Sequence, residues 1–226
     1  MKTLATTPKT TSRFKLLLSL IASLLFSISL LAFRVWYSGS FDYVFLVWNL
    51  FLAFIPFAIS TILVLHEESI KSFLVLLMLI AFWLLFFPNA PYILTDLFHW
   101  QTKGYVSLWY DLTMILSFGW NGLVLGFISL ADVQRVLTKR FSPLFGWASV
   151  ICVLILSSFG IYLGRYLRWN SWDIFINPRG LAHDILERIL NPIIHLEVWA
   201  MTIVFSVFLA LCYLPLKYFP TVTDST

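Results

Sequence analysis

Residues 72–99 read SFLVLLMLIAFWLLFFPNAPYILTDLFH. The first part is an uninterrupted apolar run, and Pro88 and Pro91 end it because proline breaks the interior of a helix. A helix needs about 20 apolar residues to cross a bilayer, and this run comes close to that length. The polar residues behind it include Asp96 and His99, and ionisable groups at membrane depth are costly. The stretch therefore predicts a membrane span followed by a polar segment. We expect the ionisable side chains of that segment to be paired with other groups or to serve a function.

The composition of the whole chain agrees with a membrane protein. Of the 226 residues, 60% are hydrophobic and 12% are charged, whereas soluble domains carry about 25% charged residues. No basic stripe of the kind that binds nucleic acid is present, so we expect no nucleic-acid partner. Cys152 and Cys212 both lie in apolar runs, which argues against a disulfide framework and against a metal–thiolate site.

Apolar runs along the chain predict the fold class, an all-α polytopic transmembrane bundle with about six spans and short interfacial helices. We expect one transmembrane domain over residues 14–216, with disordered cytoplasmic tails over 1–13 and 217–226. The predicted spans are Phe14–Phe33, Phe41–Leu65, Ser72–Phe87, Val106–Ala131, Phe145–Gly164 and Pro192–Leu216.

The distribution of positive charge predicts the orientation. With the N-terminus inside, the cytoplasmic segments hold nine Lys or Arg residues and the outer segments hold six, as the positive-inside rule requires. Arg135, Lys139 and Arg140 form a basic cytoplasmic loop with only Asp132 as an acid. We therefore expect both termini in the cytoplasm and the polar segment after Pro88 on the extracytoplasmic side.

That orientation gathers a polar cluster at the outer end of the bundle. Asn89 is a good N-cap for a short helix over residues 92–100, on which Asp96 and His99 share a face. Asp111 lies about one turn inside the fourth span, so we expect it to be paired, protonated or in contact with water. The candidate site residues are Asn89, Tyr92, Asp96, His99, Asp111, Arg165, Arg168, Asn170 and Asp173.

Arg165 and Arg168 end the fifth span and share a helix face. One interpretation is that both side chains reach the interface by snorkelling. The alternative is that they pair with Asp42, Asp96 or Asp111, or bind an anionic group such as a lipid phosphate through the guanidinium fork.

Small and polar residues predict how the helices pack. Asn49 and Pro56 lie on one face of the second span, which we expect to point into the bundle. Two small-residue stripes make the fourth and fifth spans candidates for close packing, either within the molecule or at a homo-oligomer face. These stripes are Gly119, Gly122 and Gly126 in one span and Ser157, Gly160 and Gly164 in the other.

Residues 178–190 form an amphipathic pattern that predicts a helix on the outer surface, with Asn177 as its N-cap. Asp184 and Arg188 are spaced as an ion pair, and His183 and Glu187 have the spacing of a metal pair. A wider metal site from His99, His183, His195, Asp96 and Glu187 has no HExxH-like motif behind it. No hydrolase elbow or nucleotide-binding glycine motif is present either, so we predict no metal and no cofactor.

Three motifs carry a resemblance: FPNAPYILTDLFH (87–99), WYDL (109–112) and GRYLRWNSWD (164–173). The chain from about Asn49 to Leu216 resembles an uncharacterised bacterial membrane family known as domain of unknown function 1361. The resemblance implies a multi-pass protein of the bacterial plasma membrane. It implies no activity, substrate or catalytic residue.

The function that the sequence supports is an integral membrane protein of unknown biochemical activity with a polar site at the extracytoplasmic face and membrane lipids as partners. One alternative is a membrane-embedded enzyme for a lipid or lipid-linked anionic substrate, in which Asp96, His99 or Asp111 would act as acid or base. A second alternative is a small transporter with polar residues along its path, namely Asp42, Asn49, Asp111 and Glu197.

Overall fold

The computed structural model describes residues 8–100 and 106–223, and within them every regular element is a helix. The predicted all-α class is therefore confirmed. The elements are α1 (Pro8–Ser38), α2 (Phe45–Leu65), α3 (Phe73–Phe86), α4 (Asn89–Tyr92), the 3₁₀ helix η1 (Ile93–His99), α5 (Leu108–Arg140), α6 (Pro143–Tyr166), α7 (Asp173–Ile176), α8 (Pro178–Leu190) and α9 (Leu196–Thr223).

Six segments of the described chain are long and apolar enough to cross a membrane, which agrees with the six predicted spans. They are Lys15–Ser38, Phe45–Leu65, Phe73–His99, Leu108–Arg140, Pro143–Tyr166 and Leu196–Tyr218. The predicted tails lie partly outside the described residues. In the described part, α1 begins at Pro8 and α9 continues to Thr223. The disorder of the two tails stays a prediction.

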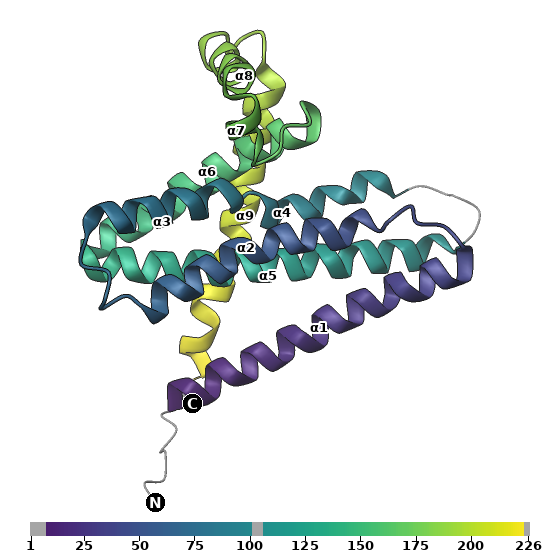
Figure 1. Cartoon of the computed structure of the whole chain (residues 1–226), viewed down its shortest axis with the longest axis horizontal. Helices are drawn as coiled ribbons and strands as arrows, with labels where there is room; N and C mark the ends of the chain where they lie inside the picture. Colours follow the sequence, from purple (N-terminus) through teal and green to yellow (C-terminus); the bar gives the residue numbers. More distant parts are fainter. Residues whose placement is uncertain (1–7, 101–105, 224–226) are drawn as a thin grey trace, which may run out of the picture.

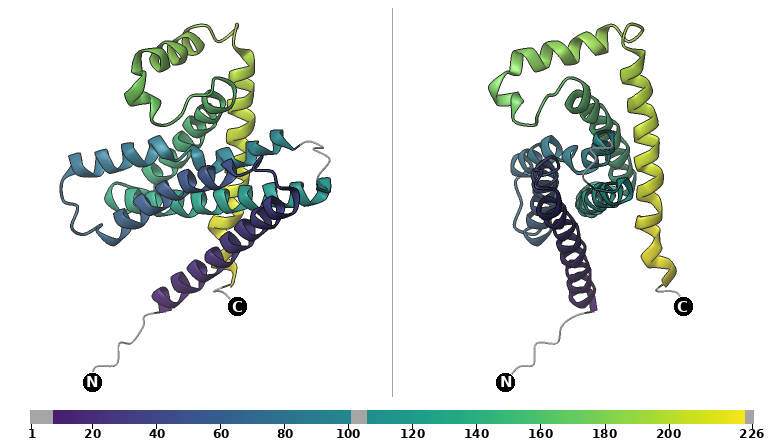
Figure 2. Two further views of the ribbon diagram at one scale, coloured as in Figure 1. Left: turned by 45° about the vertical axis from the view of Figure 1, so that its right-hand side comes forward. Right: turned by 90° about the vertical axis from the view of Figure 1, so that its right-hand side faces the viewer.

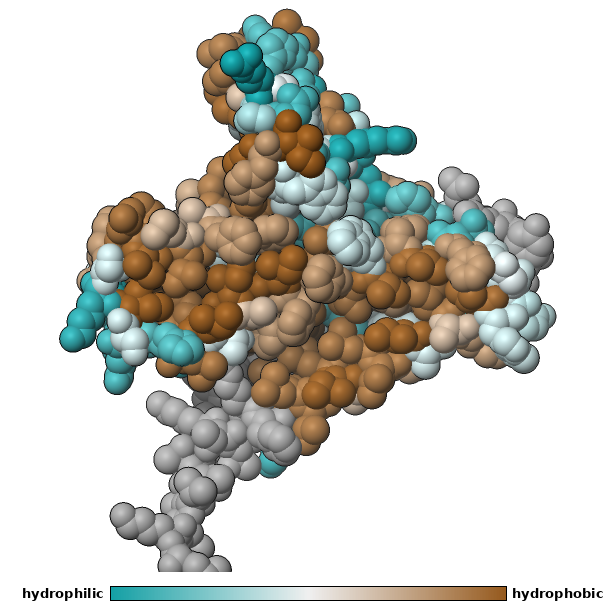
Figure 3. Space-filling model, viewed as in Figure 1, coloured by the Kyte–Doolittle hydropathy of each residue, from teal (hydrophilic) through white to brown (hydrophobic). Residues whose placement is uncertain are grey.

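The helices form a bundle around α5. In Figures 1 and 2, α2, α3 and α5 run side by side along one direction, α1 slants across them, and α7 and α8 lie to one side. The last helix, α9, runs across this common direction and packs mainly against α6. Hydrophobic residues cover the middle of α2 and α3, and hydrophilic residues gather at the turn between them (Figure 3). That distribution is the one expected of helices whose middle parts face lipid.

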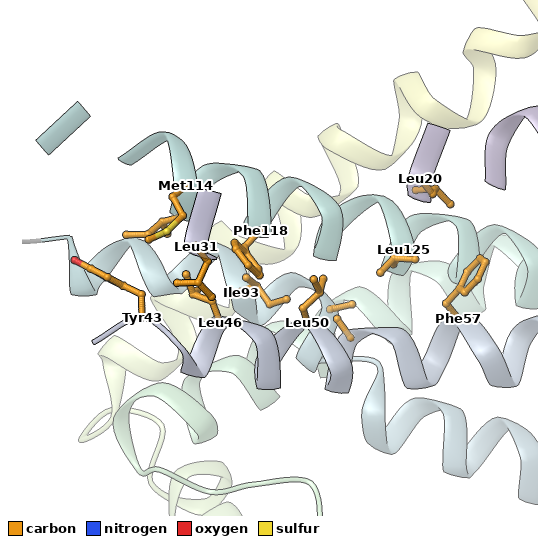
Figure 4. Close-up of a cluster of buried hydrophobic side chains, with 13 residues drawn as sticks. Leu20, Leu31, Tyr43, Leu46, Leu50, Phe57, Ile93, Met114, Phe118 and Leu125 are labelled. Atoms are coloured by element: carbon orange, nitrogen blue, oxygen red, sulfur yellow. The ribbon is translucent and has the colours of Figure 1, made fainter. Parts of the chain in front are cut away.

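The core of the bundle lies between α2 and α5. Leu46 and Leu50 of α2 pack in one buried cluster with Met114 and Phe118 of α5, and Leu31 of α1 closes it (Figure 4). The lipid-facing sides of the same helices carry exposed apolar side chains. Apolar residues thus lie both in the core and at the surface, as expected of a membrane protein. In lipid the hydrophobic effect does not bring helices together, so close packing must do so.

The short α4–η1 segment is wedged between the glycine stripes of α5 and α6. A Cβ added at Gly122 would lie 2.6 Å from the Ala90 carbonyl oxygen, and one at Gly126 would lie 2.9 Å from the Ala90 Cβ. From the other side, a Cβ added at Gly160 would approach Pro88 to 3.2 Å, and one at Gly164 would approach Tyr92 to 3.1 Å.

The expectation of close packing at these two small-residue stripes is therefore confirmed within the molecule. Both stripes pack on α4–η1, because the proline-broken segment turns back into the bundle between them. A homo-oligomer through these helices stays a prediction.

Candidate functional site

A cavity of about 880 Å³ opens at the end of the bundle where α2 begins and α6 ends. The lining residues of α2 and α3 are mainly apolar, with Phe45, Trp48, Leu52, Leu84 and Leu85, and are called the apolar wall. The polar lining residues come from α2, α4, η1, the end of α6 and the loop behind it, and are called the polar wall. Apolar residues of α7 and α8 complete the lining, namely Ile174, Leu181 and Ile185. Seven of the nine predicted site residues line the cavity: Asn89, Tyr92, Asp96, His99, Arg165, Arg168 and Asn170.

A buried ion pair forms the base of the polar wall. The Nη2 of Arg165 lies 2.6 Å from Oδ1 of Asp96, whose side chain is 1% exposed. Arg165 also donates to the Thr95 hydroxyl at 2.6 and 3.0 Å, and Asn49 donates to the second Asp96 oxygen at 2.8 Å. Of the partners considered for Arg165, the structure selects Asp96. Both charges need these extra hydrogen bonds, because an uncompensated charge at membrane depth is costly.

Two ring side chains extend this pair toward the cavity. The Arg165 guanidinium carbon lies 4.6 Å from the centre of the Tyr92 ring, within the range of a cation–π contact. His99 Nδ1 lies 4.0 Å from Asp96 Oδ1 and 3.4 Å from Arg165 Nη1. The predicted proximity of Asp96 and His99 on one face is present, and half of the His99 side chain is exposed.

Arg168 has an unusual backbone for an arginine. Its φ of 62° places it in the left-handed region just after the end of α6, where glycine is the usual residue. Leu163, in the last turn of α6, accepts a backbone hydrogen bond from Trp169 at 3.1 Å, so the chain reverses around Arg168. The exposed Arg168 side chain lines the cavity, and it forms no hydrogen bond or ion pair with any residue of 8–100 or 106–223.

The loop after α6 is tied back to the start of α4. Asn89 Nδ2 donates to the Ser171 hydroxyl at 2.9 Å and to the Phe86 carbonyl at 2.9 Å, and Ser171 donates to the Leu85 carbonyl at 3.0 Å. The expected N-cap role of Asn89 is wrong. Pro88 stands before α4 in a helical conformation, so no extended residue precedes the helix for a side chain to cap.

Asp111 lies outside the cavity, contrary to its place in the predicted cluster. Its carboxylate pairs with Arg34 of α1, at 2.7 Å from Nε to Oδ1 and 3.3 Å from Nη2 to Oδ2. Both side chains are at most 3% exposed. The predicted pairing of Asp111 is present, but Arg34 was not predicted as its partner, because Arg34 lies just beyond the predicted end of the first span at Phe33. In the structure α1 continues to Ser38, so Arg34 and Asp111 each lie about one turn from an end of their helices, α1 and α5. A basic and an acidic residue at matching depth in two spans is the signal that could have predicted this pair.

Asp173 also lies outside the cavity lining. Its Oδ2 accepts from the Asn170 backbone N–H at 2.7 Å and from Asn170 Nδ2 at 3.3 Å. Asp173 therefore shapes the turn that presents Asn170 to the cavity.

The surface helix α8 carries the acids and histidines that resembled a metal site. Asn177 caps the helix through the Gly180 N–H, and Arg188 lies 3.4 Å from Asp184, so both predicted contacts are present. Ligand atoms of His183, Asp184 and Glu187 lie within 4.8 Å of one another. Further contacts already engage the acids: Arg188 and His195 with Glu187 at 3.6 Å each, and Trp169 with Asp184 at 2.7 Å. These contacts form an ion-pair network around α8. His99 and Asp96 do not belong to the group of possible metal ligands on α8.

A comparison with known families places the chain. The model of the family described as "Protein of unknown function (DUF1361)" matches residues 48–212, so the chain belongs to this family. The resemblance inferred from the three motifs is confirmed, and each motif lies inside the match. No curated protein and no solved structure matches the chain.

Proposed function

We propose that this DUF1361 protein binds a membrane amphiphile, head group inward, in the cavity between α2, α4–η1 and the end of α6. The observation that carries the proposal is the mixed lining of the cavity, which combines an apolar wall from α2 and α3 with a polar wall from η1 and the end of α6. Ligand sites for small molecules typically enclose about 300–1,000 Å³, so the cavity has the size of a polar head group with the first part of its chains.

The apolar wall supports a route for the rest of the ligand. Trp48 lines the cavity and is 52% exposed on the outer side of α2, where lipid would lie. Its ring lies 6.3 Å from that of Trp172, so an aromatic ring from the loop after α6 lies beside the Trp48 ring of the lining. Such rings favour the boundary between the apolar and polar parts of a bilayer.

The Arg165–Asp96 pair supports binding rather than scaffolding alone. The pair is satisfied by Thr95 and Asn49, yet it stands beside a cavity instead of closing it. With the orientation expected from the positive-inside rule, the cavity opens at the extracytoplasmic face of a bacterial plasma membrane, and the ligand would enter from the outer leaflet.

The test is to fill the cavity from its apolar wall. Leu84→Trp replaces an aliphatic side chain in the cavity lining with a large aromatic ring. Leu74→Trp is the matched control on the exposed face of the same helix, α3. Native mass spectrometry of the full chain in detergent, with equal amounts of phosphatidylethanolamine, phosphatidylglycerol and phosphatidylcholine, measures bound lipid. We expect Leu84→Trp to lose bound lipid severalfold and Leu74→Trp to retain it.

A second variant protects the test against misfolding. Asn170→Trp fills the same cavity from a loop, and thermal unfolding of all variants shows whether they fold. Undiminished lipid binding by folded Leu84→Trp and Asn170→Trp would overturn the proposal.

A membrane enzyme acting on the bound amphiphile is the second candidate. The observation in its favour is the half-exposed His99 at 4.0 Å from the buried Asp96 carboxylate, at the edge of the cavity. A histidine oriented by a carboxylate can act as a general base. Incubation of the protein with a total membrane lipid extract, followed by lipid mass spectrometry, should show a conversion that His99→Ala abolishes. An unchanged lipid pool with the wild-type chain would leave binding as the function.

A further inference from the structure

We infer that the ligand of this cavity is a lipid with an anionic, phosphate-type head group, and that Arg168 recognises that head group. The inference rests on the proposed amphiphile site and adds the charge of the ligand and the residue that selects it. It follows from which charged side chains at the cavity already have hydrogen-bond or ion-pair partners and which does not.

The acids near the cavity are engaged by other groups. Asp96 is held by Arg165 and Asn49, Asp173 by Asn170, and Asp184 by Trp169 and Arg188. Glu187 lies within 3.6 Å of both Arg188 and His195. Arg168 forms no ion pair within the described residues, so the lining keeps one uncompensated positive charge.

Arg165 does not fill this role, although it lines the same cavity. Its Nε and Nη2 atoms donate to Thr95 and Asp96, and its guanidinium lies against the Tyr92 ring. The planar fork of Arg168 keeps all its donors, and a guanidinium fork matches the oxygens of a phosphate. The half-exposed His99 and the Asn170 side chain also line the cavity and can supply further hydrogen bonds.

The backbone of Arg168 adds an independent argument. A left-handed residue at the end of a helix is most easily a glycine, and a long side chain there is disfavoured. Local strain of this kind clusters at binding sites, where a particular side chain is needed. Here the strained position is the one that presents the unpaired charge to the cavity.

The apolar wall selects a lipid over a free anion as the source of the phosphate. A soluble phosphate would fill only the polar side and leave Trp48, Leu52 and Leu84 without a partner. A lipid places its head group at Arg168 and its chains along α2 and α3.

The experiment compares phosphatidylglycerol with phosphatidylcholine, because both carry a phosphate but only the first is anionic overall. Binding of each lipid to the full chain in detergent is measured for the wild type, Arg168→Gly, Arg168→Lys and the control Arg179→Gln, which alters an exposed arginine of α8 outside the cavity. We expect the wild type and Arg179→Gln to prefer phosphatidylglycerol by about tenfold, the range of one charge-assisted contact. Arg168→Gly should lose that preference, and Arg168→Lys should keep only part of it, because lysine retains the charge but not the guanidinium fork.

Arg168→Gly also separates recognition from folding. Glycine suits the left-handed backbone, so this variant should unfold at the same or a higher temperature than the wild type while it loses the preference. A preference that persists in Arg168→Gly would overturn the role of Arg168. A wild type that binds both lipids equally would overturn the anionic ligand but leave the amphiphile site standing.

Two further outcomes are decisive. Binding of neither lipid by the folded wild type would overturn the amphiphile site itself, and with it this inference. Displacement of bound phosphatidylglycerol by millimolar inorganic phosphate would show that a free anion occupies Arg168 and would overturn the lipid as its source.

Discussion

Two buried arginine–aspartate pairs hold charge inside this apolar bundle, and they differ in their surroundings. Arg34 and Asp111 are packed between α1 and α5, where the Arg34 guanidinium also lies 4.3 Å from the centre of the Tyr43 ring. Arg165 and Asp96 stand beside the cavity. The first pair therefore contributes to helix packing alone, whereas the second also forms part of the cavity lining.

Removal of one partner of the first pair should be more harmful than removal of both. Arg34→Gln or Asp111→Asn leaves a buried charge without its counter-ion, and we expect each to lower the free energy of unfolding by about 3–5 kcal/mol. The double variant Arg34→Met with Asp111→Leu should lose less than either single variant. Unfolding in mixed detergent micelles measures the three values, and a double variant that loses as much as or more than the single variants would contradict this expectation.

At the scale of elements, the decisive feature is the proline-broken segment α4–η1 between two glycine stripes. The stripes let the backbone of this segment approach α5 and α6 closely, which side chains at those positions would prevent. Because Asp96, His99 and Tyr92 lie on the segment or at its start, the glycines also position the polar wall of the cavity.

Two glycines one turn apart on α5 offer a graded test of this packing. In Gly122→Ala the new Cβ would meet the Ala90 carbonyl oxygen at 2.6 Å, which is backbone and cannot move aside easily. In Gly119→Ala it would meet the end of the flexible Leu94 side chain at 3.1 Å. We expect Gly122→Ala to destabilise the protein by about 1–3 kcal/mol and Gly119→Ala by clearly less. Equal unfolding free energies for the two variants would show that α4 does not press on Gly122.

The elements were easier to predict from the sequence than their contacts. Apolar runs located the six spans, because length and hydropathy suffice for a helix in lipid. Residues such as Asp96 and Arg165 were recognised as unusual because charge at membrane depth is rare. The partner of the glycines and the Arg34–Asp111 contact were missed, since both depend on how α4–η1 and α1 lie across the bundle, which no local pattern records.

On the scale of the whole molecule, the two ends of the bundle differ in charge chemistry. At the end opposite the cavity, Lys139 pairs with Glu67 at 3.0 Å, and Arg140 donates to the carbonyls of Ile70 and Lys71. These basic residues lie at the surface, as expected of a cytoplasmic end. The crossing of α9 over the direction of α2 and α5 carries the chain from the α7–α8 side of the molecule back across the bundle (Figure 2).

The predicted orientation can be read by labelling of single cysteines in intact cells. Glu68→Cys lies in the turn after α2, and Arg179→Cys lies on α8, both at exposed positions. If the termini are cytoplasmic, a membrane-impermeant maleimide should label Arg179→Cys in intact cells and Glu68→Cys only after lysis. The wild-type chain is the control for labelling of the native Cys152 and Cys212. The reverse labelling pattern would place the cavity on the cytoplasmic side.

The partners of the two buried ion pairs are far apart in the sequence, so they are synthesised at different times. Arg34 precedes Asp111 by 77 residues, and Asp96 precedes Arg165 by 69. At a synthesis rate of about 5–20 residues per second, Asp96 leaves the ribosome roughly 3–14 s before its arginine. During that interval Asn49 is already synthesised, and its side chain is the one among the described residues before η1 that hydrogen-bonds to Asp96 in the folded protein. The order of synthesis therefore makes Asn49 available to Asp96 several seconds before Arg165 is.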